Sequence, residues 1–364
     1  MSDFLYDIIT ITIVNNSPNN LPLSAFRNLE KLTDGGNSNI YTAFYFEVNS
    51  NVVIKIIKED KMQDSRVINE FELEYQVLTR LDHPNIIKTY GRGVTTDGRR
   101  FIVLEYLEGG TMNKVLETKS DERRGIFSRK SRFTYEEVLQ QGIQLADALN
   151  YLHSKVVINE ACIIHRGTLC IVILFVFRYL FNPLFFMKCI DLKPDNIGYT
   201  SDGTLKLMDF GLSTCVRART NVFEAYAMTG FTGSLRYMAP EVVRSEAYTE
   251  KVDVYSFGLL LYQLITNKLP YNGMKKATLI EQVINNNQRP TIRQYIPSPF
   301  FNLLTFCWHR DPNVRPSFEG IKTELALLSS QLGVNNNNNA INDHAGGDVH
   351  SRWSIFTFRR NKNL

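Results

Sequence analysis

The side chains of this sequence that could do chemistry are a lysine, several carboxylates and an amide, placed in short motifs. Lys55 ends the run VVIK, Glu74 lies within NEFELEYQVLTRL, and DLKPDN holds Asp191 and Asn196. Asp209 follows LKLM in the motif MDFG. Carboxylates can accept protons or bind cations, whereas a lysine at the end of a strand is usually an edge residue with its ammonium in water. Each motif alone is therefore weak, and their order along the chain carries the information.

The elements that must position these groups change in type along the chain. Short β-rich runs (YTAFYFEV, NVVIKII and RFIVLEY) dominate residues 26–106. One helical segment interrupts them, with four apolar residues at near-helical spacing, Phe71, Tyr75, Leu78 and Leu81. Residues 107–330 are helical in pattern. We expect an α+β fold with a β-rich lobe, a mostly helical lobe and a cleft between them, flanked by a loose leader (1–25) and a low-complexity tail (331–364).

Composition narrows the class of protein. The chain has 364 residues, 44% of them hydrophobic, and a net charge of +4, which is typical of a globular protein without the basic stripe of a nucleic-acid binder. Its five cysteines are scattered and include no C-x-x-C pair, which favours a reducing compartment. The first residues show no secretory signal. We therefore expect a cytoplasmic protein that binds no nucleic acid.

Three more motifs complete the series. YMAPE ends at Glu241, DVYSFG starts at Asp253, and RDPNVRPSF contains Arg315. Together the motifs resemble the catalytic domain of eukaryotic protein kinases over about residues 27–330. YMAPEV, KVDVYSFGLLLYQL and CWHRDPNVRPSF are similar to the tyrosine-kinase-like group, and Lys193 in DLKPDN is typical of serine/threonine specificity.

The resemblance implies a bilobal serine/threonine kinase of intracellular signalling, which uses ATP and Mg²⁺ and has protein substrates and an upstream kinase as partners. Phosphoryl transfer depends mainly on positioning and charge neutralisation. By resemblance, Lys55 holds the α- and β-phosphates, and Glu74 orients Lys55 through an ion pair. Asp209 and Asn196 would supply the oxygen ligands of Mg²⁺.

The remaining roles also follow from the resemblance. Asp191 would orient the attacking hydroxyl and accept its proton, a contribution of roughly 10²–10⁴-fold in rate. Lys193 would steady the γ-phosphate, with Ser234 on the substrate side. Glu241 and Arg315 would form a buried ion pair of the helical lobe, with a structural role.

The expected nucleotide pocket departs from the family pattern. Counting back from Ile40, the three glycine positions of the phosphate-binding loop hold Thr33, Gly35 and Ser38. Gly35 keeps the middle position, where the backbone must approach phosphate most closely. We expect a working but weakened clamp.

The adenine site is expected at the end of RFIVLEYL. Val53 is bulkier than the alanine that usually lies above the adenine. Leu104 would be the gatekeeper at the back of the pocket, and backbone groups of Glu105 and Leu107 would hydrogen-bond the adenine edge. In the activation segment, phosphate on Thr229 or Thr232 could pair with Arg166.

The catalytic motif itself is interrupted. In the family pattern His-Arg is followed directly by Asp, but here 24 residues (167–190) separate His165-Arg166 from Asp191. A transmembrane helix is one interpretation, since only Arg178, Asn182 and Pro183 between residues 169 and 187 are not apolar. Such a span would split the helical lobe across a membrane, and Pro breaks helical bonding.

Two other interpretations of the insert remain. Closing a loop of this length costs only about 3 kcal/mol, but a surface loop this apolar is prone to association. We favour retained intron sequence, because codons GGT for Gly167 and ATA for Ile190 would give splice borders and restore Asp191. Excision leaves CIIHRDLKPDN in a chain of 340 residues (364 minus 24). If the insert is translated, the alternative is a pseudokinase or scaffold.

Overall fold

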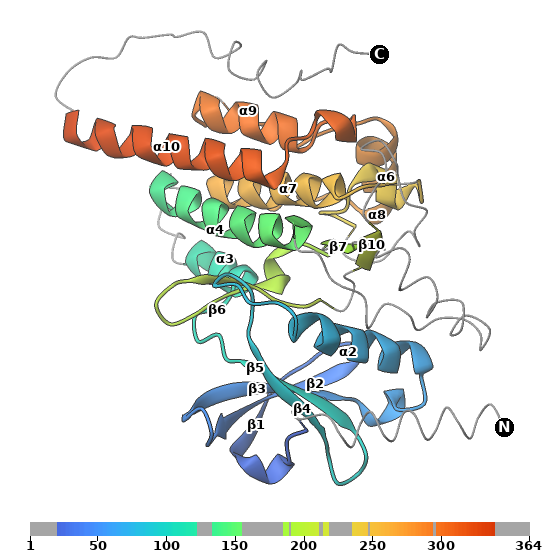
Figure 1. Cartoon of the computed structure of the whole chain (residues 1–364). Helices are drawn as coiled ribbons and strands as arrows, with labels where there is room; N and C mark the ends of the chain where they lie inside the picture. Colours follow the sequence, from blue (N-terminus) through green and yellow to red (C-terminus); the bar gives the residue numbers. More distant parts are fainter. Residues whose placement is uncertain are drawn as a thin grey trace, which may run out of the picture. The chain divides into compact units, whose positions relative to one another are not determined.

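The computed structural model describes residues 20–121, 133–154, 185–188, 191–210, 214–217, 235–246, 248–293 and 296–338 (Figure 1). The chain divides into two compact units. Of the described residues, the first unit holds 20–112 and 197–210, and the second holds the rest. The first unit carries the main sheet and the second most of the helices, which confirms the expected β-rich and helical lobes.

The first unit is built on a five-stranded antiparallel sheet in the order β1-β2-β3-β5-β4. Its strands are β1 (Phe26–Asp34), β2 (Ser38–Tyr45), β3 (Ser50–Ile57), β4 (Thr89–Val94) and β5 (Arg100–Glu105). A smaller sheet contains β6 (Gly110–Thr111), β8 (Ile197–Tyr199) and β9 (Leu205–Leu207). The helical elements of this unit are α2 (Ser65–Leu78) and the 3₁₀ turns η1 (Leu23–Ala25) and η2 (Glu59–Lys61).

Strand β3 shows how the sequence sorts the two faces of the sheet. Val52, Ile54 and Ile56 are buried in the core of the unit. Val53 and Lys55 lie on the opposite face and are only partly buried. Successive side chains of a strand point to opposite faces, and β-branched residues fit that pleated surface. The alternation therefore places Val53 and Lys55 side by side on one face.

Helix α2 presents one glutamate on its buried stripe. It begins after Asp64, whose Oδ1 accepts from the backbone N–H of Arg66 at 3.0 Å, a normal N-cap. Its buried side chains recur at helical spacing, namely Val67, Phe71, Glu74, Tyr75, Val77 and Leu78. The pattern of large apolar residues therefore also fixes Glu74 on the inner face.

Two elements end earlier than the sequence pattern indicates. Helix α2 ends at Leu78 because Thr79 Oγ1 and Arg80 Nη1 both donate to the carbonyl oxygen of Gln76. Leu81 therefore lies outside the helix. Strand β2 ends at Tyr45. A turn follows in which Asn49 has a left-handed φ of 51°, a conformation that asparagine tolerates better than most residues.

The second unit is mainly helical. Its helices are α4 (Tyr135–Ser154), α6 (Pro240–Val243), α7 (Lys251–Thr266), α8 (Lys276–Leu279), α9 (Ser298–Cys307) and α10 (Phe318–Asn338), and α3 (Met112–Asp121) starts at the boundary between the units. Short turns are η3 (Pro194–Asn196), the π-helical η4 (Ile280–Asn285) and η5 (Pro312–Val314). Every residue of α7 from Val252 to Ile265 is buried, so α7 forms the centre of the unit. Helix α10 lies along α4 (Figure 1) and continues to Asn338, into the range expected as a tail.

A two-stranded antiparallel sheet also belongs to the second unit. It pairs β7 (Phe185–Lys188) with β10 (Thr214–Arg217). Strand β7 is part of the hydrophobic insert, and residues 167–184 and 189–190 of that insert lie outside the described residues. In the described part of the chain, no helix is both long and apolar enough to cross a membrane.

Candidate active site

Lys55 on β3 and Glu74 on α2 form a two-pronged ion pair. The ammonium Nζ of Lys55 donates to Glu74 Oε1 at 2.8 Å and to Oε2 at 2.7 Å, and Glu74 is only 3% exposed. Burial lowers the pKa of Lys55, but the negative charges of Glu74 and Asp209 outweigh it, so the pKa is raised above its ordinary value. Lys55 therefore stays protonated at neutral pH and can hold an anion.

Asp209 lies close enough to influence this pair. Burial raises the pKa of the Glu74 carboxyl, the charge of Asp209 adds to the rise, and the Lys55 ammonium opposes it. Asp209 follows β9 and has a φ of 60°, in the left-handed region that residues other than glycine rarely occupy. Strand β9 is tied to the loop after α2, because Leu207 N–H donates to the carbonyl oxygen of Asn85 at 2.8 Å. The first unit thus brings Lys55, Glu74 and Asp209 together.

The second unit brings together Asp191, Lys193 and Asn196. Asn196 Nδ2 donates to the carbonyl oxygen of Asp191 at 2.8 Å and to its Oδ2 at 3.2 Å. Lys193 Nζ forms an ion pair with the same Oδ2. Asp191 and Asn196 are buried, and the turn η3 fixes their spacing. The acid, the lysine and the amide of DLKPDN therefore form one hydrogen-bonded cluster.

The expected phosphate-binding loop is the hairpin between β1 and β2. Thr33 pairs with Ile40 across the two strands, and Gly35 N–H donates to the carbonyl oxygen of Ser38 at 2.9 Å. A Cβ at Gly35 would lie 2.9 Å from that oxygen, closer than real contacts allow. The hairpin therefore closes with Thr33 and Ser38 at the outer positions, but it still requires glycine at position 35.

The expected adenine residues lie on β3, on β5 and just beyond it. Val53 pairs with Leu104 across the two strands, and Leu104 and Leu107 are buried. Glu105 N–H donates to the carbonyl oxygen of Lys88 at 2.9 Å, and the carbonyl oxygen of Leu107 accepts from Gly110 N–H at 3.0 Å. These bonds use the backbone N–H of Glu105 and the backbone carbonyl of Leu107.

A second charge cluster holds α2 from another side, and no motif in the sequence predicts it. Glu72 accepts from Arg92 Nη1 on β4 through Oε2, and from Arg100 Nη1 on β5 through Oε1 at 2.7 Å. All three side chains are largely buried. The Arg92 guanidinium also lies 4.8 Å from the centre of the Tyr75 ring. The only sequence signal was the repeat of glutamates in EFELE, which does not indicate a partner.

The structural ion pair of the helical unit is confirmed. Arg315 Nη1 lies 2.5 Å from Glu241 Oε1, and Nη2 lies 3.1 Å from Oε2. Arg315 also donates to the carbonyl oxygens of His309 and Lys251, and both members of the pair are buried. A buried arginine with all these bonds satisfied tethers α6 to the segment before α10.

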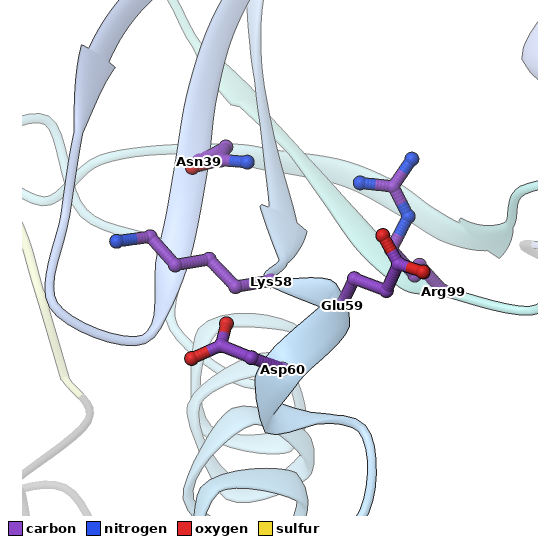
Figure 2. A pocket seen from close by; sticks show the side chains of 5 residues that line it. All are labelled: Asn39, Lys58, Glu59, Asp60 and Arg99. Carbon is purple, nitrogen blue, oxygen red and sulfur yellow. The ribbon is translucent and has the colours of Figure 1, made fainter.

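The first unit contains a polar hollow of about 560 Å³. Figure 2 shows the five side chains that line it. It is lined by Asn39 of β2, Lys58, Glu59 and Asp60 at the end of β3 and in η2, and Arg99 before β5. These side chains are half-buried or exposed and carry both signs of charge. None of the residues expected to bind nucleotide lines this hollow, so we do not assign the nucleotide to it.

Several expected residues fall outside the described part of the chain. They are His165, Arg166, Thr229, Thr232 and Ser234. The expected pairing of a phosphothreonine with Arg166 therefore stays a prediction.

Two protein-family patterns each match one part of the chain. Residues 26–170 match the family described as protein tyrosine and serine/threonine kinase, and residues 169–325 match the protein kinase domain. The two matches meet inside the insert, so a kinase pattern runs through the chain and breaks within 167–190.

Known relatives are similar over most of this chain. The serine/threonine-protein kinase VIK of Arabidopsis thaliana is 30% identical over 335 residues, 91% of this chain and 63% of its own length. A probable serine/threonine-protein kinase of Dictyostelium discoideum is 32% identical over 78% of this chain and 25% of its own. Human mitogen-activated protein kinase kinase kinase 7 is 30% identical over 74% of this chain and 37% of its own. The chain thus spans between a quarter and about two thirds of these relatives. It belongs to the protein kinase family, among the serine/threonine kinases of the tyrosine-kinase-like group.

Proposed function

We propose that this chain is a protein kinase that transfers the γ-phosphate of ATP to serine and threonine hydroxyls of protein substrates. The observation that carries the proposal is the bidentate Lys55–Glu74 pair beside the charge of Asp209. It presents an ammonium that is fixed in place and protonated, next to a carboxylate that can bind a cation. Fixed charges of both signs are what phosphoryl transfer requires of a protein.

The residues of the first unit support ATP as the nucleotide. Lys55 would hold the α- and β-phosphates below the hairpin that closes at Gly35. The adenine would contact Val53 and Leu104. Because the N–H of Glu105 and the carbonyl of Leu107 are used within the chain, the carbonyl of Glu105 and the N–H of Leu107 would bind the adenine edge.

The side chains that we propose as Mg²⁺ ligands carry suitable oxygen atoms. Asp209 offers carboxylate oxygens and Asn196 an amide oxygen, and both are hard ligands of the kind that Mg²⁺ prefers. Asn196 donates through Nδ2 to Asp191, so its Oδ1 is the atom that would bind a cation. Asp209 and Asn196 would hold Mg²⁺, which would supply positive charge against the phosphate groups of the nucleotide.

The cluster of the second unit would act on the protein substrate. Asp191 would orient the serine or threonine hydroxyl and accept its proton, and the bond from Asn196 holds the Asp191 backbone in place. Lys193, now paired with Asp191, would turn to the γ-phosphate when nucleotide is bound. A lysine at this position also supports serine/threonine rather than tyrosine specificity.

The setting of the reaction follows from the same proposal. The partners would be protein substrates and an upstream kinase that phosphorylates Thr229 or Thr232. The protein would act in intracellular signalling in the cytoplasm, and the mild net charge of +4 gives no reason to expect a nucleic-acid ligand.

One observation favours a second function. The insert separates His165-Arg166 from Asp191, and Thr33 and Ser38 replace two loop glycines. The 364-residue form could therefore be a pseudokinase or scaffold that binds partners without transferring phosphate.

Nucleotide binding tests the proposed site. Calorimetry on the 340-residue form should show ATP binding that Mg²⁺ strengthens, and Asp209→Asn should remove the effect of Mg²⁺ while leaving weak ATP binding. Absence of ATP binding in the 340-residue form without substitutions would overturn the proposal. Binding by the 364-residue form without phosphoryl transfer would favour the scaffold for that form.

A further inference from the structure

Strand β7 occupies the position that leads directly into the catalytic cluster. It runs antiparallel to β10, with Met187 opposite Cys215 and Lys188 opposite Thr214. Figure 1 shows β7 and β10 next to each other. Asp191 follows Lys188 by three residues. The strand that delivers Asp191 to its place in the second unit is therefore made of insert residues.

The sequence contains a second candidate for the same strand. In a chain without residues 167–190, the third residue before Asp191 is Ile164 and the fourth is Ile163. Residues 161–164 (ACII) would then fall in the register that residues 185–188 (FFMK) occupy here. Both stretches are rich in the apolar residues that strands favour, so either can pair with β10. Either stretch would pair with β10 in the same register, because both stretches end at the same distance from Asp191.

The catalytic cluster is intact although the insert precedes it. Asn196 Nδ2 still bonds the carbonyl oxygen of Asp191 at 2.8 Å, and Asn196 N–H donates to the carbonyl oxygen of Lys193 at 3.0 Å. An insert that looped out at random beside Asp191 would not supply a paired strand for this turn. Strand β7 also lies against α4 of the same unit, as a strand that belongs to the fold would.

We infer that in the 364-residue form residues 185–188 replace residues 161–164 as the strand that positions Asp191. As a consequence, Cys189 and Ile190 precede Asp191 in place of His165 and Arg166. The long form would therefore keep the Asp191–Lys193–Asn196 cluster but lose the arginine next to it. The role given to Asp191 rests on the proposed function, whereas the exchange of strands does not.

Cross-linking to the natural Cys215 tests the exchange without any assay of activity. Directly opposed residues of an antiparallel pair have Cα atoms about 4.5–5.5 Å apart, within the range of a disulfide. The 364-residue protein would carry Met187→Cys or the matched control Ile163→Cys, in a background that removes three other cysteines by Cys162→Ser, Cys170→Ser and Cys189→Ser. Mild oxidation followed by peptide mapping should show a disulfide to Cys215 from Met187→Cys and none from Ile163→Cys. In the 340-residue form, Ile163→Cys should form it.

The alternatives give different results. A disulfide from Ile163→Cys in the long form, with or without one from Met187→Cys, would overturn the exchange, because the original strand would then still hold the position. No disulfide from Met187→Cys would overturn the pairing of β7 with β10. Each of these results is independent of whether the protein transfers phosphate.

Hydrogen exchange tests whether the strand positions the cluster. Met187→Pro removes a backbone donor from β7 and should raise amide exchange in the peptide 191–197 of the 364-residue form. Ile163→Pro in the same form should leave that exchange unchanged. Equal exchange in both variants would contradict a positioning role for residues 185–188.

Discussion

The ammonium of Lys55 bonds both carboxylate oxygens of Glu74, at 2.8 and 2.7 Å, and so joins strand β3 to helix α2. Glu74 is buried, and the side chain of Lys55 is 20% exposed. Because the pair is bidentate, a small outward shift of α2 would weaken both bonds together. The pair therefore couples the position of helix α2 to the position of the Lys55 ammonium, which we propose binds phosphate.

Removal of Lys55 should impair both stability and function. Lys55→Met leaves the Glu74 carboxylate buried without its cation, a loss that typically costs about 3–5 kcal/mol. Urea unfolding should show the loss, and phosphoryl transfer should fall to background. The double variant Lys55→Met with Glu74→Leu should regain most of the stability but no activity. A double variant as unstable as the single one would show that the pair is not the cause.

The stability deficit of Lys55→Met should depend on pH. The pKa of Glu74 is already raised above its ordinary value of 4.5 by burial, and loss of the lysine raises it further. A carboxyl whose pKa is higher in the folded than in the unfolded protein contributes stability at pH values below its unfolded-state pKa. That contribution is lost, at a cost in stability, as the pH rises through its folded-state pKa. The deficit should therefore be largest near pH 7 and shrink toward pH 5. A deficit that is constant over this range would contradict an uncompensated Glu74 charge.

The cluster of Glu72, Arg92 and Arg100 should stabilise the position of α2 in which Glu74 bonds Lys55. Glu72→Gln leaves Arg92 and Arg100 facing each other without the carboxylate that bridges them. Since hydrogen bonds to charged groups contribute about 1.5–3 kcal/mol, we expect a stability loss of about that size. We expect kcat to fall about tenfold, which corresponds to 1.4 kcal/mol, with little change in KM for ATP.

Glu70→Gln is the matched control, because it makes the same change on an exposed position of the same helix. It should alter neither unfolding nor initial rates. If both variants behave alike in urea unfolding and in the kinase assay, the bridge between the two arginines has no special role.

The Arg315–Glu241 pair should matter for folding alone. Arg315 is 1% exposed and bonds Glu241 and two carbonyl oxygens. Arg315→Met should cost about 3–5 kcal/mol in urea unfolding, because Glu241 would remain buried and charged. Adding Glu241→Gln should recover part of the loss. A cost below about 1 kcal/mol for the single variant would contradict a buried pair.

The sequence was sufficient to predict the two-part fold and to propose residues for the site. Ordered motifs predicted Lys55, Glu74, Asp191 and Asp209 as candidate site residues, and alternating or helical periodicity placed the first two on a strand and a helix. Periodicity could also place Glu74 on the buried stripe of α2, because large apolar residues surround it.

Other features could not be predicted because they depend on contacts between distant segments. Nothing near Glu72 in the sequence points to Arg92 or Arg100, which lie on two later strands. Likewise, the insert is an apolar run without a clear period, so the four residues of β7 could not be distinguished from the rest of the insert. Their partner, β10, lies beyond Asp209 in the sequence.

Phosphoryl transfer from radiolabelled ATP to a serine- and threonine-containing protein substrate tests the proposed kinase activity itself. We predict Mg²⁺-dependent labelling of serine or threonine by the 340-residue form, and only background labelling by the same form with Asp209→Ala. The 364-residue form, measured in parallel, shows what the insert does to the rate. Labelling by the 340-residue form no greater than that of its Asp209→Ala variant would contradict the assignment of this site as a protein kinase active site.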